Sequence, residues 1–146
     1  MISVCTVSLK IILNSFKNLD FVYLGKNYAY ENWIKDALTS GKRDMEKLKI
    51  DGRFQELFSF TPAELEVFFE RQDDDFHLML RCNDRPNNAL KLLRQNLGAH
   101  FEEIEKDNLS AGVLVVTVFD DSKYTMIWFQ VKGQRHGLKR RKLNHV

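Results

Sequence analysis

The chain has 146 residues, of which 44% are hydrophobic and 29% are charged, and its formal net charge is +2. A chain of this length buries roughly two-thirds of its unfolded surface, so it needs neither disulfides nor a metal to fold. Its 11 Phe exclude an intrinsically disordered composition, and its two Pro and seven Gly leave little room for a linker between domains.

The two cysteines, Cys5 and Cys82, are too few for a disulfide framework. We expect reduced thiols and therefore a reducing, cytoplasmic environment. The first ten residues lack a charged segment ahead of an apolar one, so no signal peptide is expected. No apolar run approaches the length of a membrane span, which excludes a transmembrane helix.

The first half of the chain predicts strands followed by helices. Residues 2–13 alternate imperfectly and are rich in β-branched side chains, which favours a strand, although a helix over 8–18 is the competing interpretation. Residues 21–24 predict a short strand. Apolar residues at helical spacing predict a helix over 30–38, and a further helical turn or two is expected over 45–48.

The clearest local signal begins at Thr61, where the sequence Thr-Pro-Ala-Glu forms a capping box ahead of an apolar helical stripe. Apolar residues at every second position over 76–82 predict a strand with one core face. A helix is expected after Pro86 and should stop at Gly98. Residues 100–106 carry enough acids to predict a soluble edge strand.

Two apolar runs at 113–119 and 124–131 are joined by a polar turn and predict a hairpin. The first run is apolar on both faces, so it belongs in the centre of a sheet. The predicted fold class is α+β, with a mainly antiparallel sheet of about five strands and three or four helices packed against it. Residues 1–133 should form one compact domain and residues 134–146 a flexible basic tail.

Basic residues concentrate at the C-terminal end. Six of the 22 Lys and Arg lie after Val131 with no acid among them, which leaves 16 basic against 20 acidic residues elsewhere. Such a segment can neutralise phosphates, and without aromatics its contacts would be backbone-directed. A solvated terminus is the competing interpretation. The candidate nucleic-acid-binding residues are Lys132, Arg135, His136, Lys139, Arg140, Arg141 and Lys142.

These features favour a small non-enzymatic binding protein whose tail contacts an anionic partner, nucleic acid above all, with no cofactor, metal or membrane. The alternative is a protein-interaction module, of the immunity or inhibitor type or a homodimer. In that case the aromatic hairpin face would form the interface, since aromatic residues dominate interface hot spots. The candidate interface residues are Tyr124, Met126 and Trp128.

The second hairpin strand ends in Gln130-Val131-Lys132, which resembles the Gln-x-Lys form of the PD-(D/E)xK nuclease core over residues 113–133. The resemblance implies a metal-dependent nuclease in which the lysine orients or activates water beside carboxylates. The run 113–119 lacks the aspartate of that family. Asp120 and Asp121 fall in the turn, so Glu103, Glu105 or Asp107 would have to supply the carboxylates.

Two further groups of residues have a chemical and a structural interpretation. His77 and His100 could act as an acid–base pair in RNA cleavage with Arg81 stabilising charge, or they could be structural. Residues 73–75 are three consecutive aspartates beside Glu70, which could hold a divalent ion. Their order differs from an EF-hand loop, so a solvated loop is expected.

Overall fold

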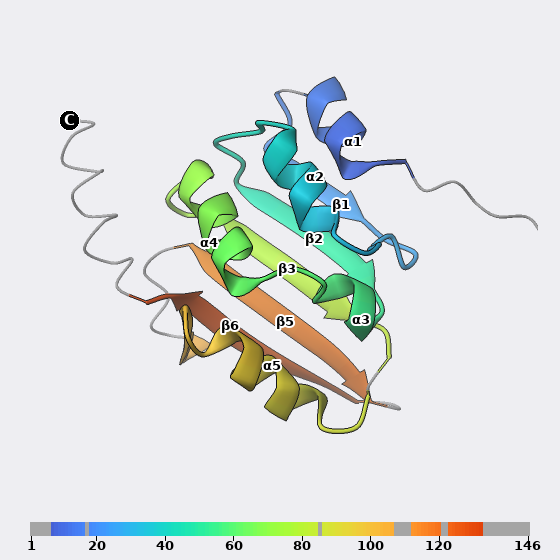
Figure 1. The fold of residues 1–146 in the computed structure, drawn as a ribbon, viewed down its shortest axis with the longest axis vertical. Coiled ribbons are helices and arrows are strands. Elements are labelled where there is room, and N and C mark those ends of the chain that lie inside the picture. Colours follow the sequence, from blue (N-terminus) through green and yellow to red (C-terminus); the bar gives the residue numbers. More distant parts are fainter. Residues whose placement is uncertain (1–6, 17, 85, 107–111, 121–122, 133–146) are drawn as a thin grey trace, which may run out of the picture.

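A six-stranded mixed sheet organises the described part of the chain, and five helices pack against it (Figure 1). The fold is seen in a computed structural model, and its class is α+β, as predicted. The structure describes residues 7–16, 18–84, 86–106, 112–120 and 123–132.

The elements follow one another with short connections. The helices are α1 (Leu9–Ser15), α2 (Trp33–Thr39), α3 (Phe54–Leu57), α4 (Pro62–Arg71) and α5 (Ala89–Leu97). The strands are β1 (Phe21–Leu24), β2 (Lys47–Gly52), β3 (His77–Cys82), β4 (Phe101–Ile104), β5 (Val113–Asp120) and β6 (Lys123–Val131).

The strand order is β1-β2-β3-β5-β6-β4. The first four strands in this order run parallel, whereas β6 pairs antiparallel with both β5 and β4. The expected mainly antiparallel sheet was therefore only partly correct, because three of the five pairings are parallel. The hairpin of β5 and β6 and the central position of β5 are confirmed.

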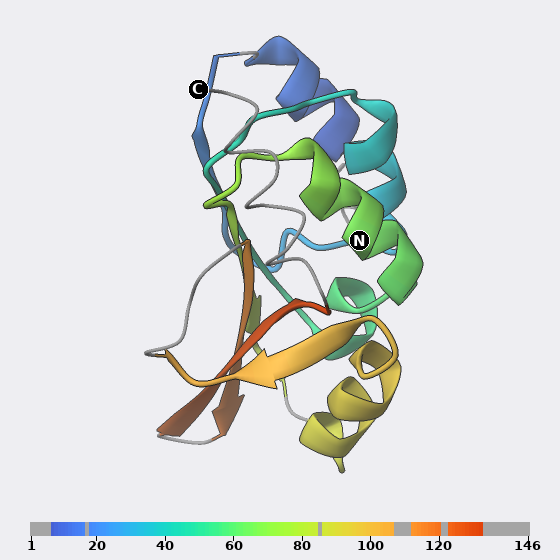
Figure 2. The same ribbon diagram turned by 90° about the vertical axis from the view of Figure 1, so that its left-hand side faces the viewer.

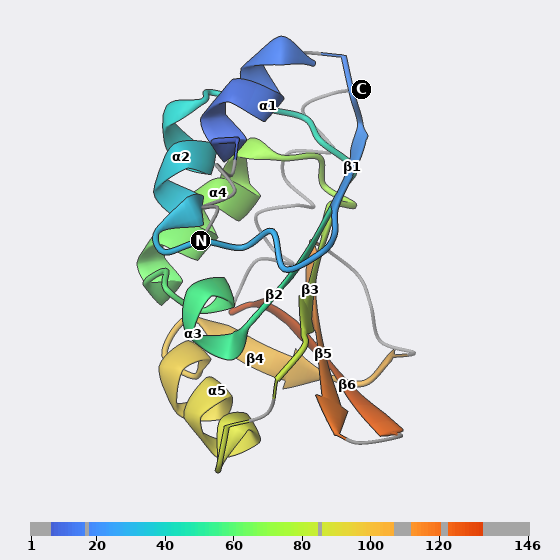
Figure 3. The same ribbon diagram turned by 90° about the vertical axis from the view of Figure 1, so that its right-hand side faces the viewer.

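All five described helices lie on one side of the sheet (Figures 2 and 3). For the helices that lie between parallel strands, this follows from the order of those strands, which advances across the sheet without reversing. Crossover connections between parallel strands are almost always right-handed, so successive crossovers in one direction place their helices on the same side. We call the other side, which bears none of the described helices, the open face.

Two local predictions were wrong, and a third, the capping box at Thr61, is confirmed. Residues 9–15 are helical, so the competing interpretation of the N-terminal segment holds there. Residues 47–52 form strand β2 rather than a helical turn, because pairing with β1 and β3 outweighs the local spacing. The capping box is present: Thr61 Oγ1 accepts a hydrogen bond from the Glu64 amide, and Glu64 Oε1 accepts one from the Thr61 amide.

The core fills the space between the helices and the sheet. Trp33 is fully buried and donates a hydrogen bond from Nε1 to the Leu57 carbonyl at 2.9 Å. Phe76 packs edge-to-face against Phe68 and Phe69 from α4, with ring centroids 5.6 and 5.3 Å apart. Aromatic pairs of this geometry stabilise a core beyond the area they bury.

Among the described helices, none has the length and apolar character that crossing a bilayer requires.

Candidate ligand-binding face of the sheet

The open face carries polar and aromatic side chains in ordered rows. Along β2, Leu48 and Ile50 point into the core while Lys47 and Lys49 alternate with them, as the two-residue period of a strand requires. The register then aligns residues of neighbouring strands. One row across the open face contains Tyr23, Lys49, Met79, Val115, Trp128 and Ile104.

The part of the open face built by β1, β2 and β3 combines positive charge with aromatic rings. We call it the basic-aromatic half, and it consists of Phe21, Tyr23, Lys47, Lys49, Asp51, His77 and Arg81. Its three permanent cations face one carboxylate, so the charge of this surface is net positive. This contrasts with the acidic excess of residues 1–131 as a whole.

Each of the three cations on this half lies over an aromatic ring. Lys47 Nζ is 5.3 Å from the centroid of the Phe21 ring, and Lys49 Nζ is 4.7 Å from that of Tyr23. The Arg81 guanidinium carbon is 5.0 Å from the centroid of Phe119 on β5. Such contacts contribute about 0.5–1 kcal/mol each at exposed sites.

Asp51 is the one acid of the basic-aromatic half, and it is buried beside Arg81. Its Oδ2 accepts a hydrogen bond from the Tyr23 hydroxyl at 3.1 Å, while its Oδ1 lies 3.9 Å from Arg81 Nε. Within the described residues, Oδ1 accepts no hydrogen bond. Asp51 therefore positions the Tyr23 hydroxyl at the carboxyl end of the parallel strands, and it offsets only part of the positive charge.

The part of the open face built by β5 and β6 is mostly apolar. The predicted interface residues Tyr124, Met126 and Trp128 all lie on it, opposite Phe119, Thr117 and Val115 respectively. Tyr124 is 61% exposed, and the other two are partly exposed. Met126 and Trp128 also line a hollow at the β4 edge together with Glu103, Ile104, Glu105, Lys106 and Ile127.

Of the predicted nucleic-acid-binding residues, Lys132 is the one the structure describes. It follows β6, its side chain is exposed, and its amide donates a hydrogen bond to the His100 carbonyl at 2.9 Å. The remaining six, Arg135, His136, Lys139, Arg140, Arg141 and Lys142, lie outside the described residues.

The residues that carry the nuclease resemblance are not assembled around Lys132 in the described part of the chain. Gln130 is buried, with 1% of its surface exposed. Glu103 forms an ion pair with Arg94 of α5, whose Nε and Nη2 lie 2.9 and 3.1 Å from its carboxylate oxygens. Asp120 ends β5 at the opposite end of the hairpin from Lys132. Asp107 and Asp121 lie outside the described residues.

His77 and His100 are far apart. His77 begins β3 and its Nδ1 is 2.8 Å from the Asp75 carbonyl oxygen, whereas His100 Nδ1 is 2.7 Å from Glu66 Oε2 of α4. Strands β5 and β6 separate β3 from β4, so about 14 Å of sheet lies between the two positions.

The three aspartates at 73–75 form a turn in which Asp73 accepts a hydrogen bond from the Asp75 amide. Among the residues that the structure describes, no three His, Cys, Asp or Glu side chains are grouped closely enough to hold a metal.

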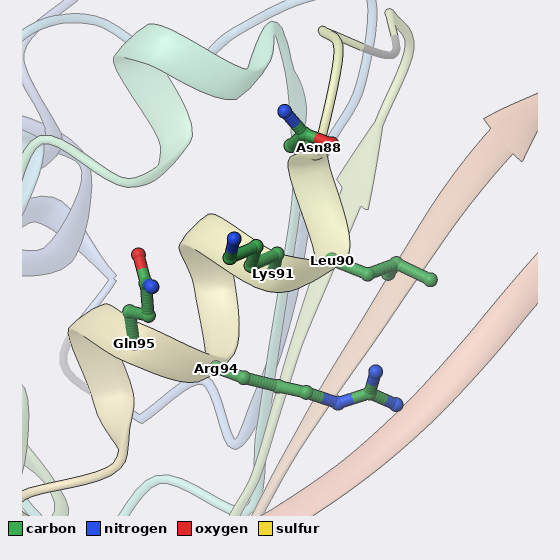
Figure 4. Close-up of a pocket in the computed structure, with 5 residues that line it drawn as sticks. All are labelled: Asn88, Leu90, Lys91, Arg94 and Gln95. Atoms are coloured by element: carbon green, nitrogen blue, oxygen red, sulfur yellow. The ribbon is translucent and has the colours of Figure 1, made fainter.

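The surface of α5 has a wide hollow lined by Asn88, Leu90, Lys91, Arg94 and Gln95 (Figure 4). The side chains of Arg94 and Gln95 extend in different directions, so the five do not converge on one point. Arg94 is also engaged by Glu103, which raises the pKa of its guanidinium through a hydrogen bond and charge attraction. This hollow is therefore a poorer candidate for a site than the open face.

Sequence reasoning missed the basic-aromatic half, although one signal for it is present. Residues 47–51 alternate as Lys-Leu-Lys-Ile-Asp, the pattern of a strand with one apolar and one polar side. Recognising that strand would have placed Lys47, Lys49 and Asp51 on a common surface. Their proximity to Arg81 depends on the parallel register of β2 and β3.

The chain matches no protein-family model and has no significant match among curated proteins or solved structures.

Proposed function

We propose that this protein binds nucleic acid, holding the phosphate backbone on the basic-aromatic half of its open face, with the basic residues after Val131 adding further contacts. The observation that carries the proposal is the pairing of Lys47, Lys49 and Arg81 with aromatic rings on the open face. Cations supply the phosphate contacts, and rings supply surfaces for bases or sugars.

The chemistry of the face favours a polyanion over a small ligand. The three cations are spread over β2 and β3, and each is partly exposed on the open face. An extended ligand with regularly spaced charges can engage all three at once, whereas a small anion can engage one or two. Releasing counterions from these contacts would make the affinity strongly dependent on salt.

The test is a salt titration of oligonucleotide binding with the full-length chain and a triple variant, Lys47→Gln, Lys49→Gln and Arg81→Gln. Each lost phosphate contact should reduce the slope of log affinity against log salt by about 0.7 for a single strand or about 0.9 for a duplex. The matched control, Lys10→Gln, Lys35→Gln and Lys91→Gln, removes the same charge from exposed lysines of α1, α2 and α5. Equal losses in both triple variants, or no binding by the unmodified chain, would refute the proposal.

A second candidate function is a protein interface through the apolar part of the open face. Tyr124, Met126 and Trp128 support it because they present three large side chains in one column of β6. Interfaces of stable dimers are enriched in such residues. Measuring the solution mass over a range of concentrations tests the homodimer form, and a monomer at the highest concentration would reject it. A Trp128→Ala variant should dissociate any dimer that forms.

A further inference from the structure

Edge strand β1 carries two large aromatic side chains, Phe21 and Tyr23, that are exposed to solvent rather than packed in the core. Phe21 and Tyr23 are 54% and 50% exposed, while Val22 between them is buried and supplies the contact of this strand with the core. Edge strands are usually protected by charged side chains, proline, bulges, short length or a covering element, and exposed aromatic rings are not among these devices. Both rings lie on the open face, beside Lys47 and Lys49 of β2.

The arrangement forms two parallel columns. Phe21 is in register with Lys47, and Tyr23 with Lys49, so each ring has a cation next to it in the same row. The two rows are separated by two residues of strand, a rise of about 6.6 Å. The surface thus repeats a unit of one aromatic ring and one ammonium group, which matches the repeated unit of a nucleic acid, one base and one phosphate.

We propose that the ligand is single-stranded nucleic acid, with unpaired bases stacked on Phe21 and Tyr23 and the adjoining phosphates held by Lys47 and Lys49. This inference rests on the proposed function and specifies the form of nucleic acid bound. The strand would run along β1, and its phosphates would follow β2. The lysines now over the rings would move to the phosphates as bases cover the ring faces.

The geometry disfavours a duplex at this position. In a duplex the faces of the bases are covered by their stacked neighbours, so an aromatic ring on a flat sheet cannot reach them. Reading a duplex groove requires a helix or ribbon that enters it, and none of the described helices is on the open face. A single strand exposes base faces, and stacking on aromatic rings is the usual way in which proteins hold it.

The experiment compares Phe21→Leu, Tyr23→Leu and the double variant with the unmodified chain. Leucine keeps an apolar side chain but lacks an aromatic face, so circular dichroism and thermal unfolding should report an intact fold. The probes are an oligothymidylate of about 16 nucleotides and a self-complementary duplex of similar length. Each substitution should weaken oligothymidylate binding by about 10-fold, and duplex binding should stay within about twofold. Phe16→Leu is the matched control, since Phe16 is also 54% exposed but lies at the end of α1, off the sheet.

The outcomes separate this inference from the proposed function. If the chain binds single strand and duplex equally and the leucine variants change neither, the stacking inference is overturned while nucleic-acid binding stands. If the chain binds neither probe, the proposed function itself is overturned. If polyglutamate displaces the oligothymidylate as effectively as unlabelled oligonucleotide does, the face recognises negative charge alone, and stacking on Phe21 and Tyr23 is refuted.

Discussion

Asp51 and Arg81 lie directly opposite each other on β2 and β3, yet they are joined only loosely. Arg81 Nε is 3.9 Å from Asp51 Oδ1, and that oxygen accepts no hydrogen bond within the described residues. Arg81 instead places its guanidinium over the ring of Phe119. The arginine is thus held near the open face without being neutralised by a close ion pair, which leaves its charge for an external anion.

This relationship predicts opposite effects of Asp51→Asn on stability and binding. The amide oxygen can keep the hydrogen bond from Tyr23, so the free energy of unfolding should fall by less than about 1 kcal/mol with the loss of the loose ion pair. Affinity for an oligonucleotide should rise, because the basic-aromatic half loses its one carboxylate. Urea unfolding and fluorescence anisotropy measure the two effects. Glu103→Gln, which removes an acid paired with Arg94, should leave binding unchanged. Weaker binding by Asp51→Asn would contradict the assignment of this surface.

Deleting residues 134–146 tests the predicted basic tail. The basic composition of this segment predicts a tail separate from the compact domain, so urea unfolding should be nearly unchanged. The deletion removes Arg135, Lys139, Arg140, Arg141 and Lys142 and should greatly weaken nucleic-acid binding. Affinity that is unchanged by the deletion would show that the tail makes no contact with nucleic acid.

The buried thiol of Cys82 should make stability fall at alkaline pH. Burial raises its pKa to about 12, and its Sγ donates a hydrogen bond to the Asp84 carbonyl at 2.7 Å. In the unfolded chain the thiol loses its proton near its ordinary pKa of about 8.5. Between about pH 9 and 12 the unfolded state therefore binds fewer protons, and this site lowers stability by up to about 1.4 kcal/mol per pH unit.

Comparing unfolding free energies of the unmodified chain and Cys82→Ala across this pH range isolates the contribution of the thiol. The free energy of unfolding should fall less steeply with rising pH in Cys82→Ala than in the unmodified chain. A second measurement uses a Cys5→Ser background, in which Cys82 is the remaining cysteine. Its reaction with a thiol reagent at neutral pH should be slow until denaturant is added. Rapid labelling of the folded chain would contradict the burial of this side chain.

Gly52 at the end of β2 should not tolerate a larger residue. A Cβ atom there would stand 2.4 Å from the Ala29 Cβ and 3.2 Å from the Leu57 Cγ. Gly52→Ala should therefore lower the free energy of unfolding by about 1–3 kcal/mol through overpacking. Gly25→Ala is the control, since its nearest contact is the movable hydroxyl of Tyr23 at 3.3 Å. Equal stability of the two variants would show that the backbone around Gly52 relaxes easily.

The capping box at the start of α4 should contribute measurably to stability. Thr61→Ala removes the hydroxyl oxygen that accepts a hydrogen bond from the Glu64 amide. The substitution should lower the free energy of unfolding, measured with a chemical denaturant, by about 1 kcal/mol. Thr61→Ser keeps that oxygen and should retain most of the stability. If the two substitutions are equally destabilising, the methyl group of Thr61 rather than its hydroxyl accounts for the contribution of this residue to stability.

Local signals in the sequence determined those features that depend on neighbouring residues. The capping box placed the start of α4, the alternation over 76–82 predicted β3, and the turn between two apolar runs predicted the hairpin of β5 and β6. The apolar run at 113–119 also determined that its strand is central. In each case the responsible interaction spans a few residues or follows from burial alone.

The tertiary structure decided everything that depends on pairing between distant segments. Residues 47–52 became a strand because β1 and β3 flank them, and the parallel register brought Lys49, Asp51 and Arg81 onto one surface. The open face itself arises because successive crossovers share one hand and one direction across the sheet. The charge of residues 132–146 was evident from composition, but the grouping of rings and cations on the basic-aromatic half was not, since these residues come from strands separated by dozens of residues.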